Sequence, residues 1–136
     1  HTMNKFDKDI REDLKFMAYS PILYISAVTR KRIYKVLELA DFVAEQHMRR
    51  ISTAELNQVV NEAMLLNPLP GGGGHKVKIL YSTQVGIAPP TFVFFANKPE
   101  LVHFSYLRYL ENELRKNFGF EGTPIKMILR KREAKE

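Results

Sequence analysis

The sequence predicts an α+β fold, in which helices pack on one face of a three-stranded sheet. Two observations carry this prediction. Residues 76–97, KVKILYSTQVGIAPPTFVFFAN, read as two strands joined by a loop, in which Pro89 and Pro90 end the pairing because proline has no backbone N–H to donate. From Ser52 onward, helical and strand patterns follow in the order α-β-β-α-β, which suits one small α+β domain.

The three expected strands differ in pattern. The second, at 91–95, is an almost continuous aromatic and β-branched run, which is typical of a strand that is covered on both sides or lies in the middle of a sheet. Its Phe92, Phe94 and Phe95 are expected in the core, and the third strand is expected at 125–129. The first strand alternates in steps of two, so one face should be buried and the other should meet solvent or a partner. Its expected buried residues are Val77, Ile79, Tyr81 and Thr83, and its outward ones are Lys76, Lys78 and Ser82.

Apolar residues at helical spacing predict the helices. The clearest boundary lies at Ser52, where Ser52 and Glu55 have the spacing of a capping box and Ile51 and Leu56 that of a hydrophobic staple. Gly119 should stop the last helix. The helices are expected over about 4–16, 30–48, 52–66 and 98–118, the last as one helix or as two that meet near 103–105.

The first segment contains a helix, a short apolar run at 22–25 with the character of a buried strand, and a second helix. One strand is not a sheet, so we expect that the chain begins inside an α/β domain whose earlier strands are missing. Alternatively, this strand joins the later sheet or pairs with a second copy of the chain. We therefore divide the chain into an incomplete α/β segment at 1–50 and the α+β domain at 51–136. Glycines 71–74 would be a flexible connector, natural or engineered.

Composition narrows the classes of function. Hydrophobic residues make up 45% of the 136 residues, which is enough for a core, and the net charge of +6 favours nucleic acid, ribosomal or acidic-membrane partners. The chain has no cysteine, which excludes disulfides and thiolate metal sites and fits a cytoplasmic location. No apolar run approaches the roughly 20 residues that span a bilayer.

Catalytic and metal sites are not expected. His47, His75 and His103 lack partners at metal-ligand spacing, and His103 is expected to pack or to cap a helix. No serine lies in the context of a nucleophile elbow. If RNA is bound, basic side chains should contact its phosphates, although a merely solvated basic face is the alternative. The candidates for RNA contact are Lys76, Lys78, Lys126, Arg130, Lys131 and Arg132.

Four segments resemble the Der/EngA proteins, a family of bacterial GTPases with two tandem GTP-binding domains. Three of them, RRISTAELNQVV (49–60), KILYSTQVGIAPPTFVFFAN (78–97) and PELVHFSYLRYLENELRKNFGFEGTPIKMILRKR (99–132), are similar to the KH-like C-terminal domain of that family. The fourth, IREDLKFMAYSPILYISAVTRKRIYKVLEL (10–39), resembles the end of the second GTPase domain. The resemblance thus implies a KH-like domain at 51–136 after a P-loop GTPase remnant at 1–50, which explains the lone strand.

The resemblance also implies a function. The intact family protein binds and hydrolyses GTP with Mg²⁺ and takes part in assembly of the large ribosomal subunit, with ribosomal RNA, ribosomal proteins and its own GTPase domains as partners. By the same resemblance, Ser26, Ala27 and Val28 correspond to a loop that presents backbone N–H groups to guanine. We expect no cofactor in this chain itself, and no membrane partner.

The sequence departs from the motifs of GTPases and of KH domains in three places, and each departure limits the function that the resemblance implies. The phosphate loop, the Asp-x-x-Gly magnesium motif and a true Asn-Lys-x-Asp are absent, so this chain is not expected to hydrolyse GTP. The match at 4–7, Asn-Lys-Phe-Asp, sits in a helical pattern too close to Ser26, and we regard it as chance. No Gly-x-x-Gly loop lies between helices, so groove recognition of the usual KH kind is not expected. We predict a non-catalytic module that docks on ribosomal RNA or protein; the alternative is an intramolecular interface that senses nucleotide state and binds little RNA.

Overall fold

The computed structural model describes residues 2–30, 32–71, 74 and 76–132. His75 and two of the four glycines of the predicted connector lie outside these residues. Along the described chain the elements are α1 (Thr2–Asp13), the 3-10 turn η1 (Lys15–Met17), α2 (Ile33–His47), α3 (Thr53–Leu66), β1 (Ile79–Gly86), β2 (Thr91–Ala96), the 3-10 turn η2 (Pro99–Leu101), α4 (Phe104–Phe118) and β3 (Lys126–Lys131).

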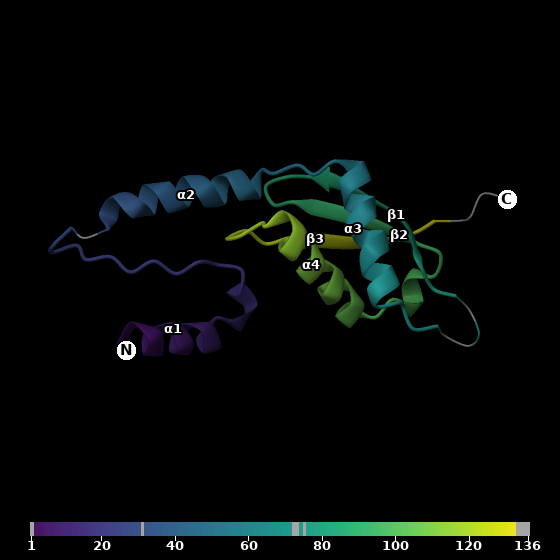
Figure 1. Cartoon of the computed structure of the whole chain (residues 1–136), viewed down its shortest axis with the longest axis horizontal. Coiled ribbons are helices and arrows are strands. Elements are labelled where there is room, and N and C mark those ends of the chain that lie inside the picture. Colours follow the sequence, from purple (N-terminus) through teal and green to yellow (C-terminus); the bar gives the residue numbers. More distant parts are fainter. Residues whose placement is uncertain (1, 31, 72–73, 75, 133–136) are drawn as a thin grey trace.

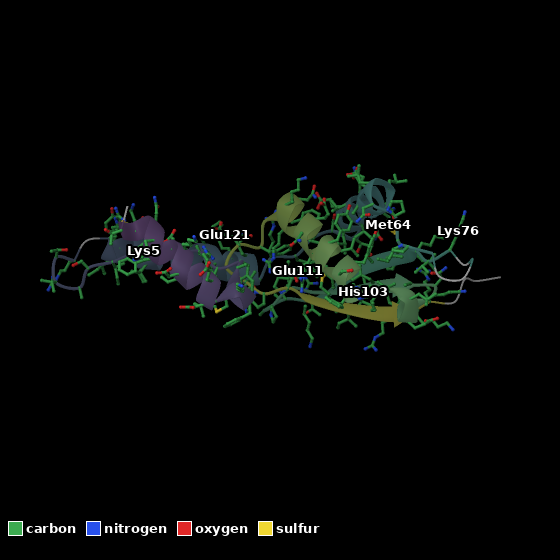
Figure 2. All side chains as sticks on the ribbon, turned by 90° about the horizontal axis from the view of Figure 1, so that it is seen from below. Lys5, Met64, Lys76, His103, Glu111 and Glu121 are labelled. Atoms are coloured by element: carbon green, nitrogen blue, oxygen red, sulfur yellow. The ribbon has the colours of Figure 1, made fainter. Side chains whose placement is uncertain are left out.

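The order α3-β1-β2-α4-β3 confirms the predicted α+β fold. The strands form one sheet in the order β1-β2-β3, with β1 antiparallel and β3 parallel to the central β2. The middle position predicted for the aromatic strand is therefore confirmed. Helices α3 and α4 lie over one face of the sheet, and side chains project from the other face without a covering helix (Figures 1 and 2).

The core lies between the sheet and these two helices. Phe92 and Phe94 of β2 are completely buried, together with Leu56 of α3 and Leu110 of α4. The serine half of the predicted capping box at the start of α3 is confirmed, because the Ser52 hydroxyl oxygen accepts a hydrogen bond from the Glu55 backbone N–H at 3.3 Å. The Glu55 carboxylate accepts from the Ser52 hydroxyl at 3.0 Å. The split of the last helical pattern is also confirmed, because η2 and α4 are separate and meet at 102–103.

The regular alternation predicted for the first strand is interrupted by a β-bulge. Ile79 lies opposite Ala96 and Tyr81 lies opposite Phe95, so Leu80 is an extra residue with no partner on β2. After the extra residue the inward and outward positions exchange. Ser82 is completely buried, although the sequence placed it outward, and Tyr81 is only half-buried. The predicted burial of Tyr81 and Thr83 on the core face is therefore wrong.

The first segment departs most from prediction. The apolar run at 22–25 is extended, but within the described residues it pairs with no strand, and Ile25 is 54% exposed. The alternative placement of this run in the later sheet is therefore wrong. Its pairing with strands that precede it in an α/β domain stays a prediction, because a strand needs neighbouring strands to satisfy its backbone hydrogen bonds. Helices α1 and α2 contain no buried residue. Figure 1 shows both to one side of the sheet.

The first segment is joined to the sheet domain by specific hydrogen bonds at the C-terminal end of α2. Gln46 Oε1 accepts from the Phe120 backbone N–H at 2.8 Å, and the Gly122 N–H donates to the Tyr19 carbonyl at 2.8 Å. His47 Nδ1 lies 2.8 Å from the Thr123 hydroxyl. We call this contact the junction; it consists of Tyr19, Val43, Gln46, His47 and Arg49 on one side and Phe118, Phe120, Gly122 and Thr123 on the other.

Candidate nucleic-acid interface

All six predicted RNA-contact residues are exposed, and the sheet gathers five of them at one end. Ile79 of β1, Ala96 of β2 and Lys131 of β3 are neighbours across the strands, so the start of β1 and the ends of β2 and β3 coincide. Lys126 pairs with Thr91 at the opposite end. The cations at the shared end are Lys76, Lys78, Arg130, Lys131 and Arg132.

The backbone that carries Lys76 and Lys78 is held in place by Asn97. The Asn97 side-chain amide donates to the Lys76 carbonyl at 2.7 Å, and its oxygen accepts from the Lys78 N–H at 3.0 Å. The two lysines are therefore presented by an ordered extension of β1, not by a loose loop. Figure 2 shows Lys76 at one end of the molecule and Lys5 of α1 at the other.

The uncovered face of the sheet, which we call the open face, is basic and partly aromatic. Because side chains alternate along a strand, Val93 and Phe95 point away from the buried Phe92 and Phe94. No residue of the three strands is Asp or Glu. The open face consists of Tyr81, Thr83, Val93, Phe95, Lys126, Ile128, Arg130 and Arg132.

Two aromatic residues on this face were assigned to the core from the sequence. Phe95 is half-buried on the open face, so its predicted place in the core is wrong, and its ring centroid lies 6.2 Å from that of Tyr81. The guanidinium carbon of Arg132 lies 5.4 Å from the centre of the Tyr81 ring. The alternation of side chains along a strand could have predicted the position of Phe95, because Phe95 is an odd number of residues away from both Phe92 and Phe94. No sequence signal marks the bulge that places Tyr81 on the open face.

Tyr106 and Tyr109 serve the core and not the interface. The Tyr106 hydroxyl donates to the Asn67 carbonyl and the Tyr109 hydroxyl to the Ala63 carbonyl, both at 2.8 Å. Burial, assisted by the neighbouring Tyr109, raises the pKa of Tyr106 to about 12. Both residues therefore tie α4 to the end of α3.

The predicted guanine loop lies in a turn of the first segment. The Ser26 hydroxyl accepts from the Thr29 backbone N–H at 3.2 Å, Ala27 is exposed, and Val28 is 94% exposed. The role of these three residues toward guanine stays a prediction. The chance match at 4–7 lies inside α1, as expected, and Asp7 accepts a hydrogen bond of 2.6 Å from the Tyr24 hydroxyl. That bond is the main cause of the raised pKa of Tyr24.

The histidines and the acidic residues form no metal centre in the part of the chain that the structure describes: no three His, Asp or Glu side chains gather there. His103 caps α4, as predicted, because its Nδ1 accepts from the Ser105 N–H at 3.2 Å. Among the described helices, none combines the length and the apolar character that a membrane crossing requires.

Comparison with known proteins identifies the sheet domain. Residues 50–130 match the family described as the KH-domain-like C-terminal domain of EngA bacterial GTPase enzymes. The chain is 60% identical over 132 residues to GTPase Der of Desulfitobacterium hafniense, covering 97% of this chain and 30% of that protein. It is 55% identical over 135 residues to GTPase Der of Desulforamulus reducens, covering 99% of this chain and 31% of the relative. The chain thus spans less than a third of the length of these relatives, and it belongs to the family of KH-domain-like C-terminal domains of the EngA, or Der, bacterial GTPases.

Proposed function

We propose that this chain is a non-catalytic module that docks a ribosome-assembly GTPase on the RNA and proteins of the large ribosomal subunit. The observation that carries the proposal is the gathering of five exposed cations at one end of a sheet whose strands contain no acidic residue. Such a surface attracts phosphates and contains no strand carboxylate that would repel them. The ribosomal partner is the one that the resemblance to the Der/EngA proteins implies, and the chain belongs to that family.

In this proposal GTP and Mg²⁺ belong to the complete relatives and not to this chain. The sequence lacks a phosphate loop, and Ser26, Ala27 and Val28 offer at most donors to a guanine base. We propose residues 1–50 as the end of the preceding GTPase domain and residues 51–136 as the KH-like domain, in a cytoplasmic protein. Under this division the exposed apolar sides of α1 and α2 are the surfaces that the rest of the GTPase domain covers.

The salt dependence of RNA binding tests the docking proposal. If the five clustered cations each neutralise one phosphate, log K for large-subunit RNA should fall with log salt with a slope of about −3.5 to −4.5. A Lys76→Gln/Lys78→Gln variant should weaken binding and reduce the magnitude of the slope by about 1.4–1.8. The matched control is Lys5→Gln/Lys8→Gln, which removes the same charge from α1 at the far end of the molecule (Figure 2). Equal effects of the two double variants would mean that binding follows net charge and not this surface.

A second function, an intramolecular interface that senses nucleotide state, is favoured by the junction. The end of α2 contacts the 118–123 loop, and this loop leads directly into β3. Displacement of the first segment would therefore reach the sheet domain. The test is to measure binding of this chain to a separately expressed GTPase domain with GTP and with GDP. Nucleotide-dependent binding there, combined with no RNA binding at low salt, would replace the docking proposal with this one.

A further inference from the structure

A shallow cavity on the open face brings two aromatic rings and two cations together. Its volume is about 410 Å³, and it is lined by Tyr81, Phe95, Lys131 and Arg132. The residues come from all three parts of the sheet's shared end: β1, β2, and β3 with the residue that follows it. The sequence analysis assigned Tyr81 and Phe95 to the scaffold, so the pairing of aromatic and basic residues here is a product of the fold.

The β-bulge at Leu80 is what places Tyr81 in this cavity. Without the extra residue, Tyr81 would continue the inward set of Val77 and Ile79, both of which are buried. With it, Tyr81 stands opposite Phe95 on the open face. Bulges redirect side chains in this way next to functional sites. Asn57 of α3 secures the position immediately after Tyr81, since its side chain accepts from the Ser82 N–H and donates to the Ser82 carbonyl, each at 2.8 Å.

The geometry of the two rings suits a flat aromatic ligand. The planes of the Tyr81 and Phe95 rings are inclined by 32°, closer to parallel than to an edge-on arrangement. Both side chains are half-buried, so part of each remains accessible to a ligand. The Arg132 guanidinium, 5.4 Å from the Tyr81 ring centre, already packs on that ring as a flat cationic group.

The charges around the rings select an anionic ligand. Lys131 and Arg132 line the cavity, and Arg130 lies on the same face beside Phe95. The pattern of aromatic rings bordered by Arg and Lys is the one that binds single-stranded nucleic acid, where bases stack on the rings and phosphates meet the cations. A duplex keeps its bases inside the helix and offers this surface no base to stack.

We propose that Tyr81 and Phe95 form a stacking platform for an unpaired RNA base, with Arg132 and Arg130, the exposed cations of the same face, contacting the adjacent phosphates. The base occupies the position over Tyr81 that the Arg132 guanidinium now holds, and the guanidinium turns to the phosphate. This deepens the docking function proposed above and rests on it. It specifies an exposed loop, bulge or single-stranded segment of RNA as the ligand of the open face.

The experiment uses the whole chain and one adenine-rich RNA that contains a 2-aminopurine base, presented either as a single strand or annealed to its full complement as a blunt duplex without a loop. We expect binding to favour the single strand and to quench the 2-aminopurine fluorescence through stacking. Tyr81→Leu and Phe95→Leu should each weaken single-strand binding about 5- to 150-fold, because they remove a ring. Arg132→Gln, a change at an exposed side chain, should weaken it severalfold and lower the salt dependence.

Phe104→Leu is the matched control, because Phe104 is an exposed ring with the Arg108 guanidinium 5.7 Å from its centre, but it lies on α4 and not on the open face. It should leave binding unchanged. Thermal unfolding of each variant checks that it folds. If a ring variant does not fold, the binding of Arg132→Gln and the 2-aminopurine quenching by the parent chain still test the stacking platform.

Three outcomes would overturn the proposal. If the parent binds single strands but Tyr81→Leu and Phe95→Leu behave like Phe104→Leu, the platform is refuted while docking on RNA stands. If the blunt duplex binds as tightly as the single strand, or if the single strand binds without quenching, recognition does not involve stacking. If the parent binds neither RNA at low salt, the docking function itself fails, and the platform fails with it.

Discussion

Substitution of Gly122 by alanine should break the junction between the first segment and the sheet domain. Gly122 has a φ of +82°, a conformation that side chains rarely adopt. A Cβ atom placed there would lie 2.5 Å from Val43 Cγ2 and 3.0 Å from Val43 Cγ1. Because no real Cβ contact is that short, α2 or the loop must move, and the hydrogen bond from Gly122 N–H to the Tyr19 carbonyl is then at risk.

Comparison with Gly74→Ala isolates the steric part of this cost. Gly74 also has a φ of +82°, but a Cβ atom added to it would meet no atom of the described residues within 4 Å. Alanine at either glycine brings the strain of the left-handed conformation, about 1–2 kcal/mol. Gly122→Ala adds overpacking of about 1–3 kcal/mol and the loss of one hydrogen bond, about 1 kcal/mol. It should therefore lower the free energy of unfolding by about 2–4 kcal/mol more than Gly74→Ala does.

Urea unfolding followed by circular dichroism measures this difference, and limited trypsin digestion locates it. The helices α1 and α2 contain no buried residue of their own, so a broken junction should expose their lysines and arginines to cleavage first. Adding Val43→Ala to Gly122→Ala removes the clashing methyl groups and should restore part of the loss. If Gly122→Ala is no worse than Gly74→Ala and Val43→Ala restores nothing, Val43 does not press on this loop and the junction is not as described.

Three further predictions concern the sheet domain. Asn57→Leu should lower the free energy of unfolding by about 2–4 kcal/mol, because it leaves the buried N–H and carbonyl of Ser82 without the hydrogen bonds that Asn57 provides. The control, Asn61→Leu at an exposed position of the same helix, should change the free energy of unfolding by less than about 0.5 kcal/mol. The pKa of Tyr106 is raised to about 12 from 10.0, so its protonated form stabilises the fold; stability should be intact below pH 10.0 and decline as the pH rises through about 12. The loss in free energy of unfolding should be at most about 1.4 kcal/mol near pH 11. Urea titrations below pH 10.0 and near pH 11 measure it, and it should be absent from Tyr106→Phe. Ser52→Ala should cost about 1 kcal/mol by removing the cap of α3 and Ser52→Gly only a few tenths, and equal losses would show that the hydroxyl does not act as a cap.

The order of elements could be predicted because each boundary has a local cause. The cap at Ser52, the prolines after β1 and Gly119 after α4 act through neighbouring residues, and local causes can be read from sequence. The aromatic run was correctly placed in the middle of the sheet, since aromatic and β-branched residues favour a strand whose side chains pack against neighbours on both adjoining strands.

The candidate site depended on causes that are not local. The exposure of Tyr81 follows from one unpaired residue, Leu80, and a bulge is decided by the register of β1 against β2, not by the residues of β1 alone. Each of the clustered cations could be named from the sequence, but their meeting requires β1 to run antiparallel and β3 parallel to the same strand. The run at 22–25 depends on a distant cause in the same way: apolar content indicates a strand, but a strand also needs a partner, and the described sheet does not supply one.

The junction also has a mechanical consequence, because it holds α2 at its C-terminal end. A helix of 15 residues is about 22 Å long, so α2 is a lever arm with its fulcrum at Gln46 and His47. A tilt of about 10° at the fulcrum would carry the first turn of α2 through about 4 Å, given the rise of 1.5 Å per residue. Conversely, a displacement of a few ångströms at the first turn of α2 would reach the 118–123 loop as a much smaller displacement. This loop precedes the strand that carries Arg130 and Lys131.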